Sequence, residues 1–207
     1  KNLKKLVPKS EIKILRTKNK KKEYNNEINE KSVKIFNPDL VLINSPASKH
    51  FYYYKKFFSK KRSFFIEKPL ESLSSKVDKR FFEKKNNFTM IGYVLRFDAS
   101  LIKIKELIDK KKFGQAKLVN IKVGQYLPYW RTNKNYQDGV SANKKLGGGV
   151  LLELSHEIDY ATWIFGYPKK LFGIAKKISN LKIDVEDVAT ILFEYPKKIV
   201  QISLDFL

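Results

Sequence analysis

The sequence contains no cysteine, and it also lacks any long apolar run. Without cysteine the protein can form neither disulfide bonds nor thiolate metal sites. A membrane-spanning helix needs roughly 20 consecutive apolar residues, and a secretory signal needs an apolar core near the N-terminus. Because both are missing, the sequence predicts a soluble, cytoplasmic protein that has no membrane partner.

Arginine is scarce, although the formal net charge is +22. Lysine and arginine together number 43, and the only arginines are Arg16, Arg62, Arg80, Arg96 and Arg131. Guanidinium groups pair bidentately with phosphate and guanine, whereas lysine acts as a point charge. Since the lysines are also scattered along the chain, we interpret the charge as a solvated surface. A basic nucleic-acid-binding module is the weaker alternative.

The apolar residues that are present, 43% of the chain, suffice for a folded core. In the first hundred residues, apolar runs typical of buried strands alternate with segments of helical spacing. The strands are expected at 11–15, 39–45, 63–67 and 88–95, and the helices at 48–60 and 70–85. This alternation predicts a parallel sheet covered by helices.

The pattern changes at Asp98, which can cap a helix that carries one apolar stripe and stops at Gly114. Long strands are then expected at 116–127, 171–179, 185–195 and 199–207, the last two joined as a hairpin. This half is predicted to be an open, mostly antiparallel sheet with helices on one face. We therefore place a domain boundary between residues 97 and 98.

Polar residues follow two neighbouring strands of the predicted parallel sheet. Asn44, Ser45 and Pro46 follow one strand, and the Glu67-Lys68-Pro69 segment follows the next. In a doubly wound sheet, ligands bind outside the carboxyl ends of the strands. A proline there ends the ladder and fixes the direction of the residue before it, here Lys68. The alternative is that Glu67 and Lys68 merely begin a polar loop.

A second candidate is the segment GGGVLLELSHEID at 147–159. Its glycines would let backbone amides approach a partner closely, and Glu153, His156 and Asp159 share one helical face. A carboxylate on one ring nitrogen of His156 would leave the other nitrogen free as a general base. Alternatively, the histidine only ties the helix to a neighbour. A metal site is disfavoured because the other histidine, His50, lies in the first half.

The order of these motifs resembles the Gfo/Idh/MocA oxidoreductases over nearly the whole chain. The resemblance rests on N-S-P-A-S-K-H, E-K-P, I-G-Y-V-L-R-F, K-E-L-I-D followed by F-G, and G-G-G-V-L-L-E-L-S-H-E-I-D followed by W-I-F-G. It implies an α/β fold in which residues 1–97 form a truncated Rossmann domain with a parallel sheet. Residues 98–207 would form a truncated α+β domain that binds substrate and makes homo-oligomer contacts.

The activity implied by the resemblance is hydride transfer between NAD or NADP and a hydroxyl or carbonyl group of a sugar, sugar nucleotide or cyclitol. A non-catalytic binding or assembly member of the same family is the alternative. Lys68 would lie beside the nicotinamide and orient the reacting oxygen, and His156 would accept the hydroxyl proton, with Glu153 and Asp159 beside it. The expected cofactor contacts are Arg16, Asn44, Ser45, Pro46, His50, Glu67, Lys68 and Arg96, and the expected substrate contacts are Lys68, Trp130, Arg131 and His156.

The sequence departs from the family pattern at three points. The family commonly has an aspartate four residues before the histidine, whereas Glu153 precedes His156 by only three residues. Gapless matching would therefore put Glu157, and not His156, in the place of the family's histidine. The glycine-rich phosphate loop is missing and the chain stops inside the second sheet, so we expect a fragment at both ends. Arg16 and Thr17 stand where an acid usually contacts the ribose of NAD. A cation there favours NADP, unless Arg16 is only a solvated turn residue.

Overall fold

The computed structural model describes residues 2–15, 26–83, 88–130 and 135–207. In the first half, β1 (Ile14–Leu15) pairs in parallel with β2 (Glu27–Ile28). A separate parallel sheet has the order β3-β4-β5 and consists of β3 (Leu40–Ile43), β4 (Ser63–Ile66) and β5 (Thr89–Ile91). The helices of this half are α1 (Asn2–Leu6), α2 (Glu30–Phe36), the 3₁₀ helix η1 (Ala47–Lys49), α3 (His50–Phe57), η2 (Ser74–Lys76) and α4 (Arg80–Glu83).

The register of the parallel sheet brings its three strand ends together. Ile43 pairs with Ile66, and Ile66 pairs with Ile91. Because the strands are parallel, the residues that follow these three isoleucines emerge at one edge of the sheet. The polar segments that begin at Asn44 and Glu67 therefore lie side by side.

Aromatic side chains hold α3 against this sheet. Phe51 and Tyr54 are buried on one face of α3, as their spacing of three residues predicts. The ring of Tyr54 meets the ring of Phe64 on β4 edge-on, with 4.8 Å between centroids. Ile43 and Ile66 complete the buried cluster. Because these side chains are buried together, α3 is held against β3 and β4, and the segment between β3 and α3 has fixed ends.

The predicted helix at 70–85 is wrong over most of its length. The described part of this segment contains only the short helices η2 and α4. Side chains compete here for the backbone groups that a helix would use: Glu71 accepts from the backbone N–H of Ser72 and Asp78 accepts from that of Arg80. The helical spacing of apolar residues was therefore overridden locally.

The second half opens with η3 (Val94–Phe97) and α5 (Ala99–Asp109). As predicted, Asp98 caps α5, because its Oδ1 accepts hydrogen bonds from the backbone of Ser100 and Leu101 at 2.9 and 3.1 Å. The helix ends before the predicted stop at Gly114, since Lys111 already has a φ of 52°. The predicted domain boundary at 97–98 falls between the two sheets.

The four-stranded sheet of this half has the order β6-β9-β8-β7. It consists of β6 (Leu118–Gly124), β7 (Lys170–Lys176), β8 (Val188–Tyr195) and β9 (Lys198–Asp205). β7, β8 and β9 are antiparallel neighbours and β6 joins β9 in parallel. Tyr195 pairs with Lys198 across the turn, which confirms the predicted hairpin. The predicted fold class, a parallel sheet followed by an open, mostly antiparallel sheet, is confirmed.

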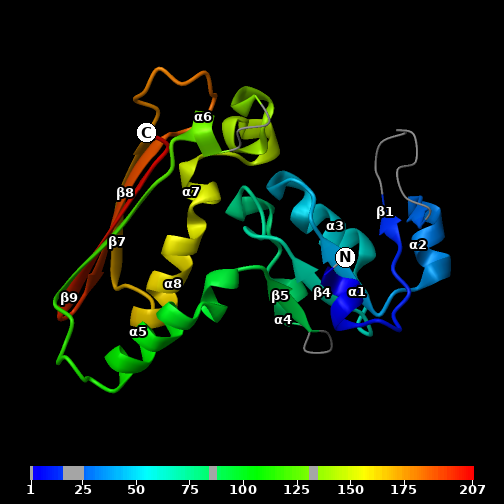
Figure 1. Ribbon diagram of the computed structural model, residues 1–207, viewed down its shortest axis with the longest axis horizontal. Coiled ribbons are helices and arrows are strands. Elements are labelled where there is room, and N and C mark those ends of the chain that lie inside the picture. The colour runs from blue at the N-terminus through cyan, green and yellow to red at the C-terminus, as the bar shows by residue number, and fades with distance from the viewer. Residues whose placement is uncertain (1, 16–25, 84–87, 131–134) are drawn as a thin grey trace.

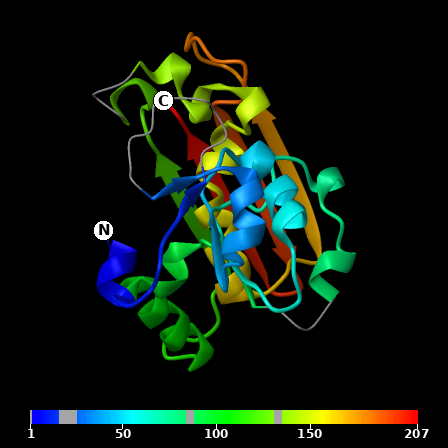
Figure 2. The ribbon, with the colours of Figure 1, turned by 90° about the vertical axis from the view of Figure 1, so that its right-hand side faces the viewer.

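Helices cover one face of this sheet. Besides α5, the helices of this half are α6 (Leu127–Trp130), the 3₁₀ helices η4 (Tyr136–Asp138), η5 (Val140–Ala142) and η6 (Lys144–Leu146), α7 (Val150–Glu153) and α8 (Ser155–Phe165). Among them, α7 packs against β8 and β9, and α8 packs against β9. In both views α7 and α8 lie between the four-stranded sheet and the first half of the chain (Figure 1, Figure 2). In the described ranges no helix is long and apolar enough to cross a membrane.

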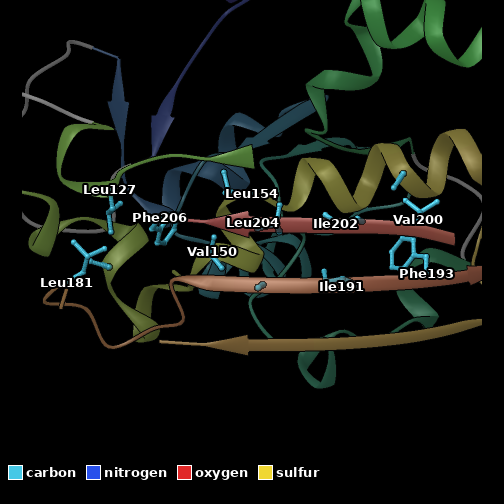
Figure 3. Packing of buried hydrophobic residues seen from close by; sticks show 13 residues of the cluster. Leu127, Val150, Leu154, Leu181, Ile191, Phe193, Val200, Ile202, Leu204 and Phe206 are labelled. Carbon is cyan, nitrogen blue, oxygen red and sulfur yellow. The ribbon is translucent and has the colours of Figure 1, made fainter. Parts of the chain in front are cut away.

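The core of the second half lies beneath these helices. Every second residue is buried from Ala189 to Phe193 of β8 and from Val200 to Leu204 of β9, and these residues meet Val150 and Leu154 of the α7 region (Figure 3). The opposite face of the sheet is exposed, including Leu118, Ile174 and Ile199. This alternation is typical of an antiparallel sheet with one covered face. The packing anchors α7, and with it the start of α8, at a fixed distance from the sheet.

Candidate active site

Lys68 belongs to the first half but is bound by the second. Its Nζ donates hydrogen bonds to the backbone oxygens of Glu153 at 2.6 Å and Leu152 at 3.4 Å. Carbonyl groups at the C-terminal end of a helix such as α7 lack intrahelical partners, so a cationic donor can bind them. The lysine is therefore held where α7 ends and α8 begins.

His156 lies on the first turn of α8 and is half-buried. Its Nδ1 is buried and has no hydrogen-bond partner among the residues that the structure describes, and its ring meets the ring of Tyr93 edge-on at 5.6 Å. Burial lowers the pKa of His156, and the positive charge of Lys68 lowers it further, whereas Asp159 and Glu67 oppose the shift. The imidazole is therefore neutral at neutral pH and able to accept a proton.

Neither of the carboxylates expected to orient His156 does so among the described residues. Both oxygens of Asp159 bind Arg96, with Nε to Oδ2 at 2.8 Å and Nη2 to Oδ1 at 2.7 Å. The Oε2 of Glu153 accepts from the hydroxyl of Ser141 at 3.0 Å. Helical spacing predicted that both acids share a face with His156, but both form hydrogen bonds with residues of other segments instead.

The expected cofactor contact Arg96 is likewise occupied by Asp159. The fork-shaped pair joins η3, which directly follows the first sheet, to α8. It leaves the Arg96 side chain 43% exposed and the Asp159 side chain only 11% exposed. Its position indicates that Arg96 aligns α8 against the first half.

A buried acid that sequence analysis did not select stands next to His156. Glu157 is only 6% exposed, and its Oε2 has no hydrogen-bond partner among the described residues. Burial raises the pKa of Glu157, and the charge of Lys68 lowers it by less. Burial together with the nearby Glu157 also raises the pKa of Tyr160 to about 12. Glu157 thus keeps its proton to a higher pH than an ordinary carboxyl group.

Glu157→Gln is expected to change how stability depends on pH. The folded-state pKa of Glu157 lies above the ordinary 4.5. The contribution of Glu157 to the free energy of unfolding therefore falls as pH rises from 4.5 through the folded-state pKa. Glutamine does not ionise, so the free energy of unfolding of the variant should increase relative to that of the parent as pH rises. One pKa unit corresponds to about 1.4 kcal/mol. Urea unfolding across the pH range measures the difference, and parallel curves for the two proteins would contradict it.

The glycine segment does not present its amides to an external partner. A Cβ on Gly148 would lie 2.2 Å from the backbone oxygen of Val140. At the start of α7, the backbone N–H of Val150 donates to the carbonyl of Glu186, and that of Leu151 donates to the Glu186 carboxylate at 3.2 Å. The close approach predicted from the glycines is real, but protein groups supply the partners.

Gly147 makes the corresponding contact with the first half. Its φ is 84°, a left-handed value that favours glycine. A Cβ there would lie 2.9 Å from the Cβ of Ala47 and 3.1 Å from the backbone nitrogen of Ser48. The second half therefore packs directly onto η1, which follows the polar segment after β3.

The other expected cofactor contacts lie at the edge of the parallel sheet. Asn44 is exposed, and the hydroxyl of Ser45 donates to the carbonyl of Pro46 at 3.4 Å. The backbone N–H of Glu67 donates to Ile43 at 2.9 Å. His50 is buried, and both of its ring nitrogens face backbone oxygens, so it is not accessible to a cofactor. Arg16 lies outside the described residues.

A cavity of about 470 Å³ adjoins α7 through Ser141, whose hydroxyl binds Glu153. Trp130 and Tyr136 line it, and Trp130 also packs against Phe206 with 6.1 Å between ring centroids. Trp130 therefore has both a packing role and a face toward the cavity. Arg131, the neighbouring substrate candidate, lies outside the described residues.

One residue near Lys68 and His156 could have been found by a rule already applied. Tyr93 follows β5 just as Lys68 follows β4, so the same rule of strand ends pointed to it. Glu157 follows His156 directly on α8, and no rule applied to the sequence selected it. The structure gathers Lys68, Tyr93, His156 and Glu157 where the two halves meet.

Comparisons with known proteins identify the family and the fold of the chain. The profile of the GFO/IDH/MocA C-terminal domain matches residues 101–207, just over half of the chain. No curated protein sequence matches the chain. Among solved structures, the WlbA dehydrogenase from Bordetella pertussis in complex with NADH and UDP-GlcNAcA is similar with a TM-score of 0.74 and 17% identity. The match covers 87% of this chain and 53% of that one.

Two further solved structures have the same fold. An oxidoreductase from Agrobacterium radiobacter in complex with NAD+, L-tartaric acid and magnesium has a TM-score of 0.71 and 19% identity, covering 88% of this chain and 53% of its own. An oxidoreductase from Desulfitobacterium hafniense, described as NADPH-dependent, has a TM-score of 0.71 and 18% identity, covering 87% and 54%. The chain thus spans about half the length of these structures. With the matched domain and the shared fold, the chain belongs to the Gfo/Idh/MocA family of oxidoreductases.

Proposed function

We propose that this protein is an NAD(P)-dependent oxidoreductase that interconverts a hydroxyl and a carbonyl group on a sugar, sugar nucleotide or cyclitol. The observation that carries the proposal is the grouping of Lys68 with the Nδ1 of His156, which is buried and has no partner within the described ranges. A cationic donor and a neutral base at one point are what removal of an alcohol proton requires.

The residues present fit the reacting end of a nicotinamide and its substrate. Two buried polar atoms there, Nδ1 of His156 and Oε2 of Glu157, have no hydrogen-bond partner in the described part of the chain. Buried polar groups are normally satisfied, so such atoms mark a place where a polar ligand fits. The chemistry that a bound nicotinamide ring supplies is acceptance of a hydride from the carbon that bears the hydroxyl.

In the direction of oxidation, His156 takes the proton of the substrate hydroxyl. Its lowered pKa keeps the imidazole neutral and ready for this step. Lys68 donates a hydrogen bond to the same oxygen and stabilises the negative charge that develops on it. Tyr93 and the carbonyls at the end of α7 fix the positions of these two side chains. In reduction, His156 returns the proton.

The substrate class rests on the cavity and on two relatives. The WlbA dehydrogenase holds UDP-GlcNAcA, and the Agrobacterium oxidoreductase holds L-tartaric acid, both of which are hydroxylated acids. In this chain Trp130 and Tyr136 offer aromatic faces in the cavity beside α7, where the apolar face of a sugar ring can pack. Arg16 favours NADP over NAD, because a cation suits the 2′-phosphate.

The exposed face of the four-stranded sheet supports a homo-oligomer. Leu118, Ile174 and Ile199 are all more than two-fifths exposed on that face. Leu118 pairs with Ile199 across neighbouring strands, and exposed apolar surface on a sheet face is typical of contacts between subunits. Light scattering of the protein should therefore give a mass above that of one subunit.

The activity is tested by following reduction of NAD+ and NADP+ with UDP-linked sugars and uronic acids, free aldoses and inositols. One or more of these should be oxidised, and Lys68→Met should not support the reaction. Cofactor binding without turnover across the panel would indicate a binding or assembly member instead. Retention on DNA that persists at physiological salt, without cofactor binding, would favour the nucleic-acid alternative.

A further inference from the structure

A buried histidine joins the two polar segments at the edge of the parallel sheet. His50, at the start of α3, is 1% exposed. Its Nδ1 lies 2.6 Å from the backbone oxygen of Pro69, and its Nε2 lies 2.6 Å from that of Ser45. One ring thus spans the segment after β3 and the segment after β4.

The two acceptors determine how many protons the ring must carry. A backbone carbonyl oxygen only accepts hydrogen bonds, so each contact requires a donor on the imidazole. A neutral imidazole has one N–H, and its other nitrogen would face an oxygen lone pair at 2.6 Å. Both contacts are hydrogen bonds only when both nitrogens of His50 are protonated. Two charge-assisted hydrogen bonds then compensate for burial of the charge.

The bond to Pro69 bears directly on the lysine that precedes it. Before Lys68, the backbone N–H of Glu67 is bound to Ile43. After Lys68, the carbonyl of Pro69 is bound to His50. The main chain of Lys68 is therefore fixed on both sides, and its side chain can span to the carbonyls of α7 without displacing the strand end.

We propose that His50 is a doubly protonated positioning residue that ties the Ser45 segment to the Pro69 segment and so aligns Lys68 with the second half of the chain. Its protonation state is independent of the proposed function. Its effect on turnover rests on that function, so the two are tested separately.

The protonation state is tested by ¹⁵N NMR of the imidazole rings of the protein near neutral pH. Signals of His50 are those that disappear in His50→Asn. We expect both of its ring nitrogens to resonate as protonated, with slowly exchanging N–H protons because the ring is buried. A spectrum of a neutral tautomer, with one unprotonated nitrogen, would overturn the proposal whatever the protein catalyses.

The positioning role is tested with a matched pair of amides. The amide nitrogen of asparagine lies as many bonds from the main chain as Nδ1, so His50→Asn keeps a donor for Pro69 and loses the one for Ser45. His50→Gln keeps a donor for Ser45, because its amide nitrogen corresponds to Nε2, and loses the one for Pro69.

The two variants should separate kinetic constants. His50→Gln should lower kcat by about 10- to 100-fold, the scale of a misplacement near 1 Å, because Lys68 is no longer aligned. His50→Asn should raise the KM for the nicotinamide cofactor while changing kcat much less. Equal losses of kcat in both variants, in step with their loss of thermal stability, would show a role in folding only and overturn the assignment.

Discussion

Lys68→Met is expected to lower kcat/KM by about 10²- to 10³-fold, the range found when one donor that stabilises a developing oxyanion is removed. Methionine has a similar length but can neither donate to the substrate oxygen nor bind the carbonyls of Glu153 and Leu152. Lys76→Met, at an exposed lysine in η2 of the same half, is the matched control and should retain full activity.

The same variant has a consequence that needs no turnover. Because the charge of Lys68 lowers the pKa of His156, its removal should move that pKa upward, toward the ordinary 6.5. NMR titration of the histidine ring measures this in Lys68→Met and in the Lys76→Met control. An unchanged His156 pKa in Lys68→Met would mean that the two side chains do not lie together. That result would contradict the proposed active site.

Gly148→Ala is expected to destabilise the protein by about 2–3 kcal/mol, within the range for overpacking a rigid site. The new Cβ would lie 2.2 Å from the carbonyl oxygen of Val140 and 2.7 Å from that of Ser141, and both are backbone atoms that cannot rotate away. The segment before α7 would have to shift, so activity should fall as well.

Gly173→Ala is the control for this substitution. Gly173 lies on β7, and the nearest atom to an added Cβ is 3.5 Å away, an ordinary contact. Neither glycine has a left-handed φ, so the pair differs in steric space rather than in backbone strain. Chemical denaturation of both variants gives the comparison. Equal stabilities would contradict the packing described for the glycine segment.

The strands and their ends could be predicted because burial leaves a strong local signal. The apolar runs at 39–45 and 63–67 contain β3 and β4, and the turn after Tyr195 marked the hairpin. β2 was missed because its two residues, Glu27 and Ile28, carry no pattern of their own and pair only through the fold. In the 70–85 segment, side chains bonded to nearby backbone could not be distinguished from helix formers by spacing.

The candidate site was predictable in its residues but not in its bonds. Strand ends and motif order selected Lys68 and His156, which lie together where the halves meet. The partners of Asp159 and His50 could not be read from the chain, because Arg96 and Pro69 approach them only after the elements pack. Glu157 was seen in the motif, but its burial depends on neighbours from other segments.

The lysine and the carbonyls that hold it come from opposite sides of residue 97. Each half has a hydrophobic cluster of its own, so slippage of one against the other need not melt either. Substitutions that loosen their contact would consequently be noticed first as lost reactivity, in protein that still looks well folded. Which substitutions are tolerated where the two halves meet then depends on whether Lys68 keeps its position. Folding assays alone would overestimate that tolerance.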